Sequence, residues 1–131
     1  MAAHDFNAIA LGETILFVDD EDMLRSVSLE VLGNNGYQVI AAKDGESALN
    51  AFEAQLFEVD LIMLDIVMPK MNGGEVARNI RLRRPDIPII FMTGYDKERV
   101  ISNEEQMGNC RVVGKPFQYE KLSYMLRELL D

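Results

Sequence analysis

The sequence LIMLDIVMP (residues 61–69) decides the fold class of this 131-residue chain. Its first four residues are all apolar, which is typical of a strand that is covered on both faces. A carboxylate, Asp65, follows this run directly. Four other short apolar runs occupy residues 15–18, 37–41, 89–92 and 110–113. Together the five runs predict five strands buried in one parallel sheet.

Segments with helical periodicity separate these runs. Asp44 is placed to cap a helix that begins directly after it, and Asn72, with Glu75 three residues later, resembles a capping box. The apolar residues at helical spacing are Leu24, Val27, Val31, Ala48, Leu49, Phe52, Val76, Ala77, Ile80, Leu122, Met125, Leu126 and Leu129. Strands that alternate with helices indicate βαβ units, so we expect a doubly wound α/β fold.

The composition is globular, with 48% apolar and 27% charged residues. The 13 basic and 22 acidic residues give a net charge of −9, which argues against direct nucleic-acid binding and favours a cation or a partner with a basic face. No apolar run is long enough to cross a bilayer, so we expect no membrane contact. A single cysteine, Cys110, excludes an internal disulfide and fits a cytoplasmic location.

Polar residues follow four of the apolar runs. Asp19 and Asp20 come after the first run, Asp65 after the third, Thr93 after the fourth, and Lys115 shortly after the fifth. In a doubly wound sheet, ligands bind outside the carboxyl ends of the strands. We therefore expect these residues, which lie far apart in the sequence, to meet at one edge of the sheet.

Carboxylates that meet a hydroxyl and an ammonium group are suited to phosphoryl chemistry. Clustered carboxylates repel one another and offer the oxygen ligands that suit Mg²⁺, an ion that often bridges carboxylates to phosphate. A carboxylate can also act as a nucleophile and form an aspartyl phosphate. Mg²⁺, Lys115 and the Thr93 hydroxyl would then share the charge of the phosphoryl oxygens.

Four motifs give the chain a resemblance to the receiver domain of two-component response regulators, in the CheY-like superfamily. They are VDDE at residues 18–21, DIVMP at residues 65–69 with Asn72 and Gly73 following, TG at residues 93–94, and KPF at residues 115–117. The resemblance covers residues 13–131, and residues 1–12 are interpreted as a lead-in or linker. It implies a flavodoxin-like fold: a five-stranded parallel sheet in the order 2-1-3-4-5 with helices on both faces.

The resemblance also implies a metal cofactor and its ligands. Mg²⁺ would be held by Asp20, Asp65 and the backbone carbonyl of Val67, and Asp19 would act partly through water. All four residues belong to the motifs that carry the resemblance.

The same family pattern implies how the phosphoryl group is held. Asp65 would be the phosphoacceptor, and Thr93 and Lys115 would contact the group once it is attached. The peptide bond between Lys115 and Pro116 is expected to be cis, in a turn that aims the Lys115 ammonium into the site.

The expected function is a phosphorylation-dependent signalling switch. In the family, the donor is a phosphohistidine on a histidine kinase or a phosphotransfer domain, which docks mainly on the first helix. The domain catalyses only its own phosphorylation and dephosphorylation, and it relays its state to an output protein that the sequence does not identify. It would act as a free-standing receiver or as the receiver piece of a larger protein, such as a hybrid kinase.

Two alternatives use similar features. An aspartyl-phosphate hydrolase of the haloacid-dehalogenase type usually carries a second aspartate two residues after its nucleophile, where this chain has Val67. A flavodoxin-like binder of flavin mononucleotide needs a phosphate loop after the first strand, where Asp19 and Asp20 would repel phosphate. The hydrolase is kept as the alternative.

Three features depart from the family pattern. Val112 stands where the family often carries Tyr or Phe, a ring whose movement is coupled to the threonine. Residues 95–107 are unusually polar for a fourth helix, so we expect phosphorylation to order or shift this segment, with Tyr95 as the lever. Gly74 stands at a usually apolar position of the third helix, at a cost of about 1 kcal/mol relative to Ala in a helix interior.

Overall fold

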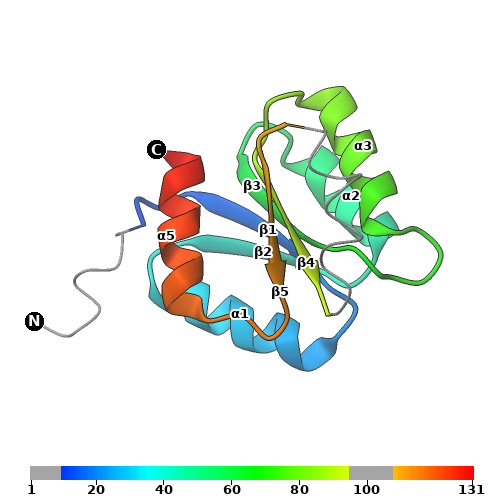
Figure 1. Ribbon diagram of the computed structural model, residues 1–131. Helices are drawn as coiled ribbons and strands as arrows, with labels where there is room; N and C mark the ends of the chain where they lie inside the picture. Colours follow the sequence, from blue (N-terminus) through cyan, green and yellow to red (C-terminus); the bar gives the residue numbers. More distant parts are fainter. Residues whose placement is uncertain (1–9, 95–107) are drawn as a thin grey trace, which may run out of the picture.

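The computed structural model describes residues 10–94 and 108–131. Its five parallel strands form one sheet in the order β2-β1-β3-β4-β5 (Figure 1), which confirms the expected order. The strands are β1 (Thr14–Val18), β2 (Gln38–Ala42), β3 (Val59–Asp65), β4 (Ile89–Thr93) and β5 (Cys110–Gly114). Because all of them run the same way, their carboxyl ends share one edge, here called the carboxyl edge, and their amino ends share the opposite, amino edge.

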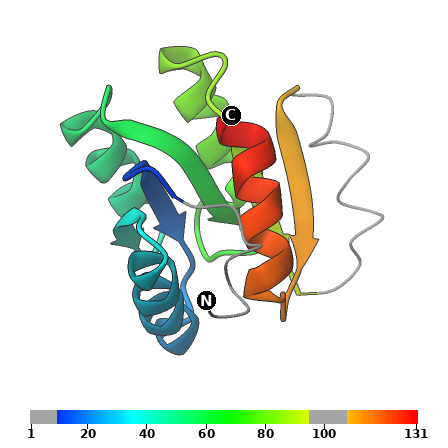
Figure 2. The ribbon, with the colours of Figure 1, turned by 90° about the vertical axis from the view of Figure 1, so that its left-hand side faces the viewer.

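Helices cover both faces of this sheet, as expected for a doubly wound fold. They are α1 (Asp22–Asn34), α2 (Gly45–Ala54), α3 (Gly73–Arg83) and α5 (Tyr119–Leu130). Two perpendicular views place α1 and α5 on one face of the sheet, and α2 and α3 on the other (Figure 1, Figure 2). No helix within residues 10–94 and 108–131 has the length and apolar character needed to cross a membrane.

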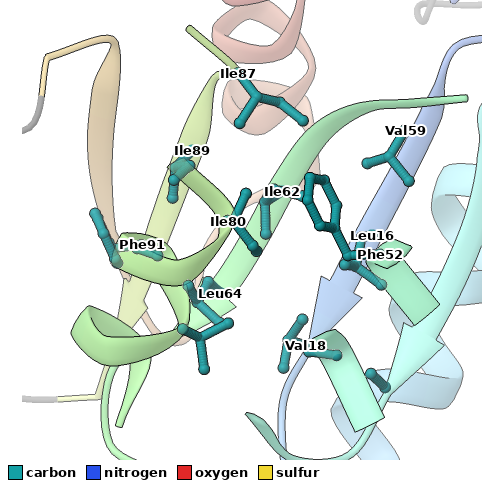
Figure 3. Close-up of a cluster of buried hydrophobic side chains, with 14 of the residues drawn as sticks. Leu16, Val18, Phe52, Val59, Ile62, Leu64, Ile80, Ile87, Ile89 and Phe91 are labelled. Atoms are coloured by element: carbon teal, nitrogen blue, oxygen red, sulfur yellow. The ribbon is translucent and has the colours of Figure 1, made fainter. Parts of the chain in front are cut away.

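Side chains of the strands alternate between two hydrophobic cores. Leu16 and Val18 of β1 point to the side of α2 and α3, where they are fully buried in the cluster drawn in Figure 3. Ile15 and Phe17 point to the opposite side and pack in a core that includes Leu126 of α5. Full burial of each such side chain stabilises the fold by about 1.5–3 kcal/mol. The sheet is therefore fixed from both faces, which makes its carboxyl edge a rigid platform.

The predicted helix caps are present. The side chain of Asp44 accepts a hydrogen bond of 2.7 Å from the Ser47 backbone N–H, at the start of α2. At the start of α3, the side chain of Asn72 accepts one of 3.0 Å from the Glu75 N–H. Each cap satisfies a backbone donor that would otherwise lack a partner in the first helical turn. The capping side chains of Asp44 and Asn72 therefore fix where α2 and α3 begin.

Two local expectations need correction. β2 begins at Gln38 rather than Tyr37, because the Tyr37 N–H donates to the Leu32 carbonyl of α1 and so belongs to the turn before the strand. Gly74 is the second residue of α3, in its first turn. The penalty for glycine in a helix interior therefore does not apply to it in full. Residues 95–107, including the proposed fourth helix and Tyr95, lie outside the described residues.

Candidate functional site

Three carboxylates converge at the carboxyl edge of the sheet. Asp19 and Asp20 follow β1, and Asp65 is the last residue of the neighbouring strand β3. One oxygen from each side chain lies within 4.8 Å of the others. Asp19 is fully buried, Asp65 is 3% exposed, and Asp20 is exposed to solvent. The expected meeting of these three residues is confirmed, and the cluster has a buried side and an open side.

Asp19 is fixed by several hydrogen bonds. Its backbone N–H donates to the Ala42 carbonyl at 3.1 Å. Its Oδ1 atom accepts from the Glu21 backbone N–H at 2.8 Å, and its Oδ2 atom accepts from the Lys115 ammonium at 2.9 Å. Both carboxylate oxygens are therefore held, although the group is removed from water. A buried charge requires such partners.

Lys115 joins the cluster from the turn after β5. Its Nζ atom lies 3.4 Å from Asp65 Oδ2 as well as 2.9 Å from Asp19 Oδ2. Burial disfavours its charged form, but the hydrogen bond to Asp19 and the charges of Asp65 and Asp19 outweigh burial, so the pKa of Lys115 is raised. The bond between Lys115 and Pro116 is cis, as expected. The ammonium therefore stays charged and bridges the two buried carboxylates.

The Asp65 carboxyl group has an unusual protonation equilibrium. Burial raises its pKa from 3.8 to about 6, and the nearby Asp19 charge acts in the same direction. Lys115 and a hydrogen bond of 3.3 Å from the Val67 backbone N–H oppose that rise without cancelling it. One lysine close to two buried carboxylates leaves an excess of negative charge. A buried carboxylate with a raised pKa at a strand end is a candidate functional group.

Thr93 and Val67 take the expected positions at the same edge. Thr93 is the last residue of β4 and is buried. Its backbone carbonyl accepts a hydrogen bond of 2.7 Å from the backbone N–H of Lys115. This bond ties the turn that carries Lys115 to the end of β4. Val67 contacts Asp65 through its backbone, while its side chain is 55% exposed. All six residues singled out from the sequence thus lie at the carboxyl edge.

Gly73 supports the site in a way that sequence reasoning did not anticipate. A Cβ atom at this position would lie 2.4 Å from the Asp65 carbonyl oxygen and 2.8 Å from the Ile66 Cα atom. Such distances are too short for any side chain, so only glycine allows α3 to begin against the backbone of β3. The Gly73 N–H also donates to the Ile66 carbonyl at 2.9 Å. The motif residue after Asn72 therefore fixes the backbone that carries Asp65.

Val112 occupies the middle of β5, and its side chain packs against the core on the α2–α3 side of the sheet. The position is partly buried. Valine has one side-chain torsion and no ring, so a ring movement cannot occur at this point of the strand. The structure therefore places a small aliphatic side chain where the family often carries an aromatic ring.

The donor set fits a hard divalent cation. The three carboxylates supply oxygen ligands, which are the ligands that Mg²⁺ prefers. The exposed side of the cluster leaves room for the water molecules that Mg²⁺ usually keeps. A cation would also offset the Asp19 charge, which adds to burial in raising the pKa of Asp65.

Comparisons with known proteins agree with this geometry. The sequence matches the family model of the response regulator receiver domain over residues 15–127. It is 35% identical to the sensor kinase CckA of Brucella abortus over 118 residues, which cover 90% of this chain and 12% of the kinase. It is 34% identical to the alkaline phosphatase synthesis transcriptional regulatory protein PhoP of Bacillus subtilis over 122 residues, which cover 92% of this chain and 49% of that protein.

Solved structures are similar over nearly the whole fold. The receiver domain of the hybrid histidine kinase CckA superimposes with a TM-score of 0.78 at 30% identity, covering 90% of this chain and 99% of that one. The chemotaxis protein CheY4 of Vibrio cholerae gives a TM-score of 0.82 at 30% identity, covering 91% of this chain and 99% of that one. These comparisons do not support the hydrolase alternative. The chain belongs to the response regulator receiver domain family, whose members act in phosphorelay signalling, and it shares that signalling function.

Proposed function

We propose that Asp65 is the phosphoacceptor of this receiver and that a phosphohistidine on a histidine kinase or phosphotransfer domain is its donor. An Asp65 carboxylate oxygen attacks the phosphorus atom, the new O–P bond forms, and the P–N bond breaks as the imidazole leaves. Water later hydrolyses the acyl phosphate, which returns the carboxylate and releases inorganic phosphate. The domain thus catalyses only reactions on its own side chain.

One observation carries this assignment above the others. Asp65 combines burial, a pKa raised to about 6, and a lysine ammonium 3.4 Å from its Oδ2 atom. At neutral pH this carboxyl group is mostly ionised, so it can act as a nucleophile, and its negative charge is incompletely balanced. Both oxygens of Asp19 accept hydrogen bonds of 2.8 and 2.9 Å, whereas those of Asp65 accept longer ones of 3.3 and 3.4 Å, so Asp19 is held more tightly and is the poorer nucleophile.

Lys115 and Thr93 take the supporting roles. The Lys115 ammonium already contacts Asp65, and it would pair with the phosphoryl oxygens that replace that contact. The Thr93 hydroxyl, at the end of the adjacent strand, would donate a hydrogen bond to the same group. Phosphoryl transfer depends mainly on positioning and on neutralising these oxygens.

Asp19, Asp20, Asp65 and the carbonyl of Val67 would hold Mg²⁺. When bound, Mg²⁺ supplies positive charge that stabilises the transferring phosphoryl group. Asp20 is the carboxylate that faces solvent, which suits it to receive the ion first. The donor partner and a cytoplasmic location belong to the proposal, as does the relay of the phosphorylated state to an output protein.

Intact-mass measurement tests the assignment. Acetyl phosphate with Mg²⁺ should add one phosphoryl group to the protein, and Asp65→Asn should abolish the addition. The matched control is Asp86→Asn, an exposed carboxylate before β4 at the amino edge, which should leave phosphorylation unchanged. Full phosphorylation of Asp65→Asn would refute the proposal.

A further inference from the structure

Arg25 has an unexplained position at the start of α1. It is the fourth residue of the helix, where the positive end of the helix dipole disfavours a cation. The helix also has no side-chain cap on its first backbone donors. Within α1 its partner is the exposed Asp22, and such an i,i+3 ion pair stabilises a helix only slightly. A contact outside the helix is therefore needed to explain this position.

Those contacts lead to the acidic cluster. An Arg25 guanidinium N–H donates to the Asp19 backbone carbonyl at 2.8 Å, and a second N–H donates to the Asp22 carboxylate. The side chain of Arg25 is only 19% exposed, whereas that of Asp22 is 91% exposed. The guanidinium therefore makes two bonds, a fork with a buried branch to Asp19 and a solvent-exposed branch to Asp22.

The Asp19 carbonyl is the last free group of a residue that is held at every other polar atom. Its N–H and both carboxylate oxygens already have partners in β2, the α1 turn and Lys115. Arg25 completes this set, and its bond fixes the peptide unit that leads directly into Asp20. Within residues 10–94 and 108–131, the exposed Asp20 carboxylate has no hydrogen bond or ion pair of its own, so its position depends on that peptide.

We infer that Arg25 is a positioning residue for divalent-cation binding, which rests on the proposed function of this site. Its guanidinium holds the turn between β1 and α1 so that the oxygens of Asp19 and Asp20 converge with Asp65. Two effects of removing it oppose one another. Loss of a positive charge near the cluster strengthens cation binding by electrostatics, whereas loss of the bond to Asp19 weakens it.

Two substitutions at Arg25 separate these effects. Arg25→Gln removes the charge and the fork, and Arg25→Lys keeps the charge but cannot make both directed bonds. If Arg25 positions the turn, both variants bind Mg²⁺ more weakly, about tenfold for Arg25→Gln, as for other residues that orient metal ligands. Arg78→Gln, at an exposed arginine of α3, is the control for the change in net charge and should bind Mg²⁺ as the parent chain does.

Calorimetric titration of the unphosphorylated protein with Mg²⁺ measures these affinities directly. In the acetyl phosphate reaction, the Mg²⁺ concentration at half-maximal rate should rise by the same factor while the rate at saturating Mg²⁺ is unchanged. Tighter Mg²⁺ binding in Arg25→Gln, or parental affinity in both Arg25 variants, would overturn the inference. Phosphorylation of Asp65→Asn would instead overturn the proposed function, so the two failures are distinguishable. Should Arg25→Gln fail to fold, Arg25→Lys alone decides between positioning and charge.

Discussion

A carboxyl group at each of the two edges of the sheet has a shifted pKa, and the two shifts have opposite directions. At the amino edge, Arg127 of α5 is buried and donates to Glu13 at 2.5 and 3.0 Å and to Asp131 at 2.7 Å. Figure 1 shows the C-terminal end of α5 beside the start of β1, where Glu13 lies. The hydrogen bond from Arg127 lowers the pKa of Glu13 to about 2. At the carboxyl edge, burial raises the pKa of Asp65 to about 6.

The opposite pKa shifts of Glu13 and Asp65 distinguish a charge that stabilises the fold from a charge that belongs to the candidate site. Glu13 gains more from its arginine than it loses by burial, so its ionised form stabilises the native state. For Asp65, burial and the neighbouring Asp19 charge outweigh the lysine that the two carboxylates share, so its ionised form destabilises the metal-free native state. A cation or a partner for the carboxyl edge would relieve that cost, whereas the amino edge needs neither.

Breaking the amino edge should have the largest effect on stability. Arg127→Gln leaves Glu13 partly buried without its cation, which should lower the free energy of unfolding by about 3 kcal/mol. Denaturant unfolding measures the change. Arg83→Gln, which breaks a half-exposed ion pair with Glu53, is the matched control and should cost less than about 1 kcal/mol. Equal losses of unfolding free energy in the two variants would show that the buried ion pair of Arg127 stabilises the fold no more than a half-exposed one.

Removing the charge of Asp65 should raise the free energy of unfolding, whereas Arg127→Gln lowers it. Between pH 3.8 and about 6 the folded state binds more protons at Asp65 than the unfolded state does, so stability falls as pH rises through this window. Asp65→Asn should therefore stabilise the metal-free protein near neutral pH by up to about 3 kcal/mol, and this gain should vanish in acid below the window. Melting curves across pH test this, and a neutral-pH destabilisation would contradict it.

Glu13 should give the mirror image of that profile. Its pKa is 4.5 when unconstrained and about 2 in the fold, so its contribution is complete above the higher value and is lost as pH falls toward the lower one. Glu13→Gln should flatten the stability profile between about pH 2 and pH 4.5, whereas Asp65→Asn should flatten it between pH 3.8 and about 6. A single substitution that flattened both ranges would contradict the independence of the two edges.

Mg²⁺ should have the smallest effect, and it should act at the carboxyl edge alone. At tenfold excess over its Kd, binding should stabilise the protein by about 1.4 kcal/mol, a rise of several degrees in Tm. Arg127→Gln should retain this increment, because its network is remote from the acidic cluster. Sodium at matched ionic strength is the control and should not reproduce the effect. An unmoved melting curve in Mg²⁺ would remove the basis for the metal site.

The carboxyl edge was predictable from the sequence because one topological rule brings all strand ends together. Knowing that Asp19, Asp65 and Thr93 each follow a buried apolar run was enough to place them at neighbouring strand ends. The amino edge was not predictable, because Arg127 and Glu13 are joined by the packing of α5 and no local pattern marks the pair. Gly73 is part of a motif in the sequence, but its supporting role was not predictable, since that role depends on how closely α3 approaches the Asp65 carbonyl.

The read-out of the switch stays a prediction. Val112 lies in β5 as expected, without an aromatic ring, but residues 95–107 lie outside the described part of the chain. Hydrogen exchange with and without a phosphoryl mimic would test whether phosphorylation orders that segment. Protection that rises on activation is the expected result, and equal, strong protection in both states would contradict it.

Reductive trapping of the phosphorylated protein tests the central claim most directly. Acetyl phosphate and Mg²⁺ load the domain, and borohydride then reduces an aspartyl phosphate to homoserine, which peptide mass spectrometry locates in the sequence. We expect homoserine at residue 65 and at no other aspartate, because among the described aspartates Asp65 is the one that combines burial and a pKa raised to about 6 with a contact to Lys115. Homoserine at Asp19 or Asp20, or trapping that persists in Asp65→Asn, would contradict the account.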